Sequence, residues 1–154
     1  MSTEDKIKSL GLKLPELPKP FGAYVPATRI NDVLFTSGQG PILEGKIKYQ
    51  GKLGKDLTLE EGYEAAKLCA LNCLSAIKTE IGDLDKIERI VKLVGFVNSA
   101  QGFIKQSQVI NGASDLLQNL FGERGKHARV AVGASELPNN MAVELEMMVK
   151  LKAS

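Results

Sequence analysis

Residues Met141–Lys152 read MAVELEMMVKLK, and this stretch decides much of the fold. Apolar side chains occupy every second position from Met141 to Leu151, and mainly polar ones stand between them, including Glu144 and Glu146. Successive side chains of a strand point to opposite faces of a sheet, so a period of two predicts a half-buried strand. The mainly polar face of this strand would carry both glutamates.

A long helix is predicted over Leu59–Ile81. Thr58 and Glu61 have the spacing of a capping box, and Gly82 follows as a stop signal. Apolar residues recur at helical spacing along this segment and predict one buried stripe, which consists of Ala66, Ala70, Cys73, Leu74, Ile77 and Ile81. Cys69 and Cys73 lie four positions apart in this helix. Both are best interpreted as small core residues, because a zinc site needs more ligands.

The other segments complete an α+β pattern. Strands are expected at residues 22–29, 33–37, 46–50, 87–97 and 128–135, a short helix at 4–10 and a second long helix at 103–121. Pro26 places the first strand at an edge or bulge. The turn residues 137–140 would let the last two strands pair as an antiparallel hairpin. Both long helices would cover one face of a single mixed or antiparallel sheet.

Composition indicates one globular domain. The chain has 154 residues, of which 44% are hydrophobic, enough for one core. We expect an N-terminal arm at residues 1–20, which three prolines keep from regular helix, and a single domain at 21–154. The net charge of +2 argues against nucleic acid as a partner. Without an apolar span or a secretory signal, a cytoplasmic location is expected.

The second face of the predicted sheet has nothing in the chain to cover it. Glu144 and Glu146 would lie there beside Met148. A polar yet partly apolar sheet face is typical of a subunit interface that contains a ligand site. The pattern therefore favours a homo-oligomer.

Several short motifs occur in a recognisable order: Gly22-Ala23-Tyr24, Thr36-Ser37-Gly38-Gln39, Gly95-Phe96-Val97, Ala128-Arg129, Leu137-Pro138 and Val143-Glu144-Leu145-Glu146. Together, over residues 20–150, they resemble the YjgF / reactive-intermediate deaminase (Rid) family, also labelled the endoribonuclease L-PSP family. The resemblance implies a chorismate-mutase-like fold and a homotrimer. It also implies hydrolytic deamination of small enamine or imine carboxylates (2-iminoalkanoates) to 2-oxo acids and ammonia, without metal or organic cofactor.

The resemblance assigns roles to residues. Arg129 would clamp the substrate carboxylate, since a guanidinium offers two parallel donors. Glu144 would hold the hydrolytic water, and the backbone N–H of Gly38 would bind the substrate. Ser37 and Tyr24 would contribute a hydroxyl and a phenol. Without the resemblance, each has a plain structural interpretation: a surface arginine, an outward-facing strand glutamate, a turn glycine, a serine at the end of a strand and a strand aromatic.

Some positions depart from the family pattern. Ala131 stands where many deaminating members have cysteine, Gln101 where they have asparagine and His127 where they have proline. We keep Gln101 and His127 as substrate-binding candidates. His127 is the only histidine, and the sequence places no nucleophile beside it for Ser/His or Cys/His catalysis. The chain is also longer than typical members, which indicates a divergent subgroup.

Two other functions compete with deamination. The departures favour a trimer that binds small carboxylates or partner proteins without turnover. Ribonuclease activity ranks last, because RNA cleavage needs a basic track and a clear acid–base pair.

Overall fold

In the computed structural model, which describes residues 1–19 and 22–154, helix α2 spans Leu59–Ile81 as the sequence predicts. The Thr58 hydroxyl accepts from the Glu61 N–H at 3.2 Å, and the Glu61 carboxylate accepts from the Thr58 N–H at 3.0 Å. Gly82 ends the helix with a φ of 81°, a backbone conformation that favours glycine. All six residues of the predicted stripe are buried.

Helix α3 covers Gln106–Phe121 and begins three residues later than the sequence predicts. Residues 100–103 form a turn instead, in which the Phe103 N–H donates to the Ala100 carbonyl at 3.0 Å. The apolar residues that repeat at helical spacing along α3 are buried, namely Val109, Ile110, Ala113, Leu116, Leu117 and Leu120. Gly112 lies where α3 crosses α2: a Cβ there would stand 1.9 Å from the Tyr63 carbonyl oxygen, so only glycine allows this contact.

The main sheet is mixed and has the strand order β1-β2-β7-β5-β6. Its strands are β1 (Ala27–Ile30), β2 (Val33–Thr36), β5 (Ile87–Asn98), β6 (Ala128–Ala134) and β7 (Val143–Leu151). The expected hairpin of the last two strands is wrong, because β5 lies between β6 and β7, parallel to β6 and antiparallel to β7. Helix α3 connects β5 to β6, and a helical crossover returns the chain to the same end of the sheet.

Two expected strands are shorter in the structure. Strand β1 begins at Ala27 rather than Gly22, because Pro26 has no N–H for the ladder; as Pro26 predicts, β1 is an edge strand. The strand expected at residues 46–50 is only β4 (Lys46–Ile47), which pairs with β3 (Ile42–Leu43) outside the main sheet.

The N-terminal segment begins with helix α1 (Thr3–Ser9), whose Ile7 is buried in the core. The Thr3 N–H and hydroxyl both donate to Asp85 of the 3-10 helix η1 (Leu84–Lys86), at 2.9 and 2.6 Å. Two further 3-10 turns, η2 (Gly122–Gly125) and η3 (Pro138–Asn140), precede β6 and β7. The boundary that we expect between arm and domain falls at residues 20–21, outside the described residues.

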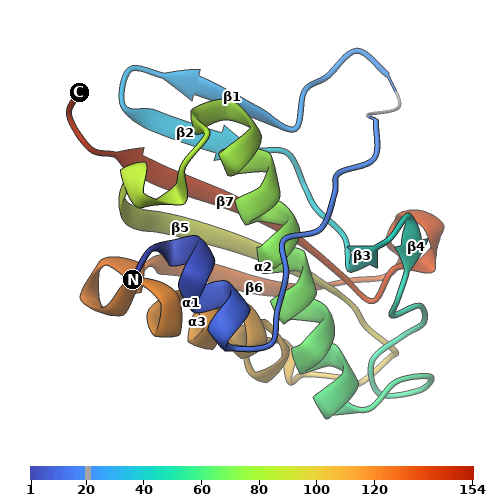
Figure 1. Cartoon of the computed structure of the whole chain (residues 1–154). Coiled ribbons are helices and arrows are strands. Elements are labelled where there is room, and N and C mark those ends of the chain that lie inside the picture. Colours follow the sequence, from blue (N-terminus) through green and yellow to red (C-terminus); the bar gives the residue numbers. More distant parts are fainter. Residues whose placement is uncertain (20–21) are drawn as a thin grey trace.

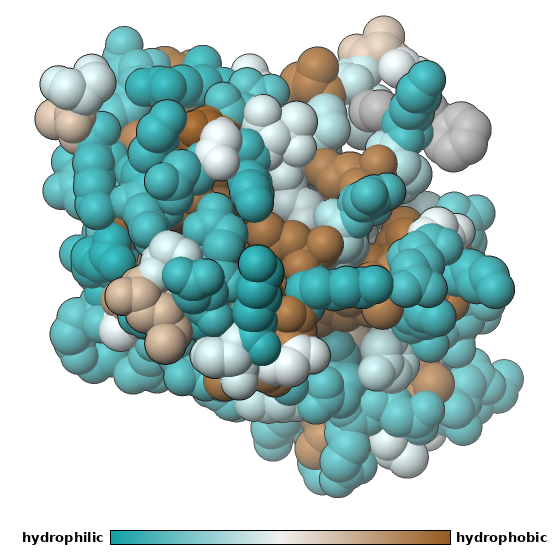
Figure 2. All heavy atoms as spheres, in the orientation of Figure 1, coloured by the Kyte–Doolittle hydropathy of each residue, from teal (hydrophilic) through white to brown (hydrophobic). Residues whose placement is uncertain are grey.

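The helices lie on one side of the sheet, with α1 and α2 in front of the strands in Figure 1. The fold is α+β with a mixed sheet, as expected. Figure 2 shows this side of the molecule, where hydrophilic side chains cover most of the surface and hydrophobic ones show mainly toward the middle of the view. On the other face, Val130 and Val132 of β6 remain 41% and 42% exposed. In the part of the chain that the structure describes, no helix is long and apolar enough to cross a membrane.

Candidate functional site

Gly38 and Glu144 lie against each other beside the end of β2. Gln39 and Leu145 exchange both backbone hydrogen bonds, at 2.8 and 3.0 Å. This bridge is offset by one residue from the β2–β7 register, so a bulge lies between Thr36 and Gln39. The bulge contains Gly38, and a Cβ added there would stand 3.0 Å from the Glu144 carboxyl carbon. The absence of a side chain at Gly38 therefore leaves room for the Glu144 carboxyl.

The environment of Glu144 favours its protonated form. The residue is half-buried. Burial raises the pKa of the Glu144 carboxyl above its ordinary value, and the charge of the neighbouring Glu146 raises it further. A carboxylate with a raised pKa is a stronger base than an ordinary one, which suits the acceptance of a proton from water.

Ser37 and Tyr24 belong to segments that run side by side at the same end of β2. The Ser37 N–H donates to the Pro26 carbonyl at 2.7 Å, and its hydroxyl donates to the Val25 carbonyl at 2.5 Å. The neighbouring Tyr24 is 55% exposed. The Ser37 hydroxyl proton is thus engaged within the chain, while the Tyr24 side chain extends into solvent.

Arg129, near the start of β6, is held by helix α3. Its Nη1 donates to the Asn111 Oδ1 at 2.8 Å and to the Ser114 Oγ at 3.1 Å, and its Nη2 donates to the Ser107 carbonyl at 3.4 Å. Among residues 1–19 and 22–154, no partner is found for Nε. The Nε edge of the guanidinium therefore remains available for a carboxylate.

His127 lies beside Arg129 and contacts a serine that the sequence did not indicate. Its Nε2 is 2.8 Å from the Ser114 Oγ, and its Nδ1 is 2.6 Å from the Gly125 carbonyl. Nothing in the sequence indicated a hydroxyl beside His127, and the structure places one there, that of Ser114. Asn111 and Ser114 are three residues apart on α3 and so share one side of the helix, next to its buried stripe. This spacing was visible in the sequence, but the approach of His127 was not.

Arg129 and Glu144 do not meet within one chain. Leu93 of β5 stands between Arg129 and Met147, whereas Phe96 stands between Val132 and Glu144. Val132 is three positions after Arg129 on β6, and successive residues of a strand point to opposite faces of the sheet. Arg129 therefore points to the helix-covered face, where α3 binds it, and Glu144 points to the open face.

The remaining candidate, Gln101, is exposed in the turn between β5 and α3. That turn follows the end of β5 where Val97 pairs with Val143, so Gln101 and Glu144 lie toward the same end of the sheet. Within one protomer, the structure thus forms two groups of predicted site residues. The first is Glu144 with Gly38, near Ser37 and Tyr24, and the second is Arg129 with His127.

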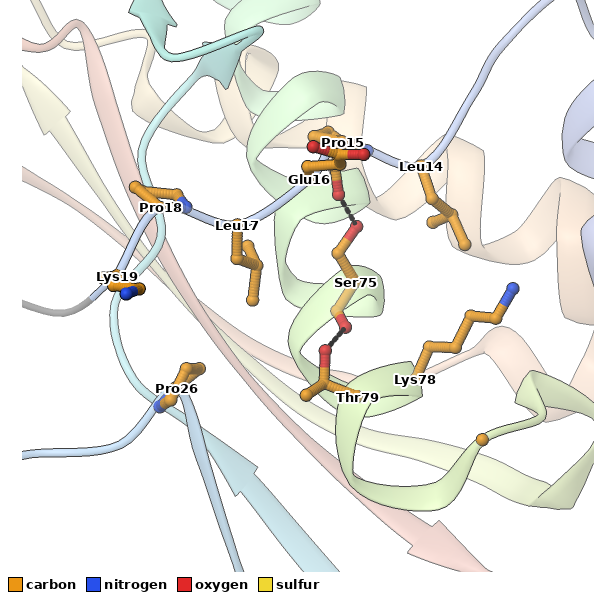
Figure 3. A pocket seen from close by; sticks show the side chains of 11 residues that line it. Leu14, Pro15, Glu16, Leu17, Pro18, Lys19, Pro26, Ser75, Lys78 and Thr79 are labelled. Atoms are coloured by element: carbon orange, nitrogen blue, oxygen red, sulfur yellow. Dashed lines mark hydrogen bonds between the residues drawn. The ribbon is translucent and has the colours of Figure 1, made fainter.

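A cleft of about 710 Å³ lies elsewhere. Figure 3 shows it between the arm and the C-terminal half of α2, where the Ser75 hydroxyl donates to the Pro15 carbonyl at 2.7 Å. Many of its labelled side chains are leucines and prolines, and none of the predicted site residues lines it. The cleft between α3 and β6 is smaller, about 260 Å³, but both His127 and Arg129 line it.

The chain is similar to known proteins over almost its whole length. The family model described as "YjgF/chorismate mutase-like, putative endoribonuclease" matches residues 4–151. Protein TCP17 of Trypanosoma cruzi is 44% identical over 146 residues, which cover 94% of this chain and 91% of that protein.

Solved structures show the same architecture. A Shewanella oneidensis protein is 38% identical, with a TM-score of 0.95, and the match covers 98% of this chain and all of the other. TdcF of Escherichia coli, whose structure contains bound serine, is 22% identical with a TM-score of 0.58, over 92% and 99% of the two chains, and shows the fold alone. By the family model and by the likeness to its relatives, the chain belongs to the YjgF/chorismate mutase-like family.

Proposed function

We propose that the protein hydrolyses small imine or enamine carboxylates of the 2-iminoalkanoate type to 2-oxo acids and ammonia. The observation that carries this proposal is the half-buried Glu144 carboxyl beside the bulge at Gly38. An imine carbon is already electrophilic, so its hydrolysis needs little beyond a positioned water and a path for protons. Glu144 would take a proton from that water, and the Gly38 N–H would bind the substrate.

Arg129 would bind the substrate carboxylate through its Nε edge. Because Arg129 and Glu144 point to opposite faces of their own sheet, we infer that one site takes them from two protomers. Arg129 lies on β6, at an edge of the sheet, so a neighbouring protomer can approach it. His127 would line the same side of the site, and Tyr24, Ser37 and Gln101 would come from the protomer that supplies Glu144.

The open face of the sheet supports self-association. It carries Val130 and Val132, both more than one-third exposed, and the partly buried Phe96. Exposed apolar side chains gathered on one sheet face are typical of an interface. We propose a homotrimer, the assembly that the family resemblance implies, with this face turned toward the other protomers.

The experiment that tests the proposed function uses 2-iminobutanoate, generated in situ from threonine by a dehydratase. Wild-type protein is expected to accelerate the release of ammonia above the uncatalysed rate. The control is the same mixture with heat-denatured protein. If wild-type protein binds 2-oxobutanoate in calorimetry but gives no acceleration, the non-catalytic binding protein is the better description.

Mixing two inactive variants tests the shared site. Arg129→Ala and Glu144→Gln are unfolded together and refolded as an equimolar mixture. In a randomly mixed trimer, about a quarter of the sites contain a wild-type residue from each side, so about a quarter of the activity is expected to return. No recovery, despite mixed trimers seen by mass spectrometry, would show that each site lies within one protomer.

The Glu144→Gln variant is expected to lose about 100-fold in kcat, because glutamine cannot accept the water's proton. The raised pKa of Glu144 places the acid limb of wild-type activity above the ordinary carboxyl pKa. The raised pKa belongs to the folded protein and the ordinary pKa to the unfolded chain. At pH values between the two, the folded protein binds more protons than the unfolded chain, so the contribution of Glu144 to the free energy of unfolding falls as pH rises. The variant is therefore expected to be more stable than wild type at neutral pH, as measured by urea unfolding. Equal stability at pH 7 would contradict the assigned environment.

A further inference from the structure

The cleft between α3 and β6 contains a serine, Ser114, that the deamination proposal does not use. Ser114 and His127 line it together with Asn111 and Arg129. Ser114 and His127 are only partly buried, and their exposed parts line the cleft. Their side chains are 2.8 Å apart, within direct hydrogen-bond reach.

The contacts of His127 define its tautomer. The Gly125 carbonyl lies 2.6 Å from Nδ1 and can only accept, so Nδ1 carries the hydrogen. In the neutral ring Nε2 then carries a lone pair and no hydrogen, so it accepts a hydrogen bond from the Ser114 hydroxyl. A serine hydroxyl that donates to a histidine, itself oriented by a third group, is the arrangement of an activated nucleophile.

The surroundings keep His127 in the neutral form that can accept a proton. Burial lowers the pKa of the imidazole; the Gly125 carbonyl acts in the opposite direction, and the charge of Arg129 lowers it further. The other charged groups that line the cleft are Lys126 and Asp115. Asp115 accepts a hydrogen bond from the Tyr63 hydroxyl at 2.7 Å.

A charged donor stands beside the serine oxygen. Arg129 Nη1 is 3.1 Å from the Ser114 Oγ, where its charge favours an alkoxide. Asn111 accepts from the same guanidinium nitrogen through its Oδ1, at 2.8 Å, and so helps to hold Arg129 beside Ser114. Arg129 can therefore donate to the substrate oxyanion that forms beside Ser114.

We propose that Ser114 and His127 form a serine–histidine acyl-transfer site, specific for esters with a small acyl group that the cleft can hold. The Ser114 oxygen bonds to the ester carbonyl carbon while its proton moves to His127 Nε2. The ester C–O bond then breaks, and the departing alcohol takes that proton. Water then bonds to the acyl carbon while His127 Nε2 takes one of its protons; the bond from the acyl carbon to the Ser114 oxygen breaks, the acid leaves, and that proton passes from His127 to the Ser114 oxygen. No metal, oxidant or further co-reactant is required.

The proposed ester chemistry shares His127 and Arg129 with the proposed deamination site but needs Ser114 as its nucleophile, so a test that reads Ser114 separates the two. Purified full-length protein is incubated with an alkyl fluorophosphonate, which forms a bond from a nucleophilic serine oxygen to phosphorus and expels fluoride. Intact-mass and peptide mass spectrometry are expected to find one adduct, on Ser114, and none in Ser114→Ala. His127→Gln keeps a polar partner for the serine but cannot take its proton, so labelling is expected to slow by about 100-fold.

Ser107→Ala provides the matched control, because Ser107 is an exposed serine on the same helix whose backbone carbonyl, not its side chain, contacts Arg129. This variant is expected to label at the wild-type rate. The proposal is overturned if folded wild-type protein leaves Ser114 unlabelled, or if His127→Gln labels as fast as wild type. The rate of 4-nitrophenyl acetate hydrolysis should rank the variants as labelling does: wild type and Ser107→Ala fastest, His127→Gln slower and Ser114→Ala inactive.

Discussion

Arg129→Ala is expected to lower kcat/KM for 2-iminobutanoate by about 1000-fold. The guanidinium would make two charge-assisted hydrogen bonds to the substrate carboxylate, each contributing about 2 kcal/mol, and about 4 kcal/mol corresponds to about 1000-fold in rate. Arg129→Lys retains the charge without the planar fork and should recover only part of the loss. Initial rates of ammonia release at several rates of imine generation measure the effect.

The matched control is Arg29→Ala. Arg29 is exposed on the edge strand β1, and its Nε donates to the Asn31 carbonyl within its own turn. Its loss should leave the deamination rate unchanged. Because α3 holds Arg129 through Asn111 and Ser114, the folded state of Arg129→Ala is verified by urea unfolding first. A folded Arg129→Ala protein with wild-type kcat/KM would refute the carboxylate clamp.

Gly112→Ala is expected to lower the free energy of unfolding by about 3 kcal/mol, near the upper end for overpacked sites. A Cβ at this position would stand 1.9 Å from the Tyr63 carbonyl oxygen, so α2 and α3 must separate. Helix propensity alone predicts the opposite, a gain of about 1 kcal/mol for alanine over glycine. Urea unfolding followed by circular dichroism decides between the two effects, and the melting temperature should fall by roughly 8 °C.

Asn119→Ala, at an exposed position of the same helix, serves as the control. Its change in unfolding free energy should stay within about 0.5 kcal/mol. A stabilised Gly112→Ala protein would show that α2 and α3 adjust their spacing without loss of packing.

The helices and the last strand could be predicted because their signals are local. The capping box at Thr58 and the stop signal at Gly82 predict both ends of α2 at the residues where the structure has them. The alternation along β7 predicts which of its side chains are buried. Strand partners were harder, because nothing within residues 128–151 shows that β5 enters between β6 and β7. That arrangement follows from the crossover through α3.

Some residues of the candidate site could likewise be predicted from the sequence, and others could not. The motifs of the family led to Glu144 and Gly38, and the structure brings these two together. Ser114 was missed because its partner, His127, lies in another element 13 residues further along. The arrangement of Arg129 and Glu144 on opposite faces also needed the register of three strands.

The sequence by itself determined the elements of this protein, because capping residues, the helical spacing of apolar residues and strand alternation act over a few neighbours along the chain. It also determined membership of the family through motifs spread over residues 20–150. Only the tertiary structure decided that Arg129 points to α3, that Glu144 points to the open face and that Ser114 meets His127. Contacts between distant residues depend on strand order and helix packing, and no local pattern encodes these directly.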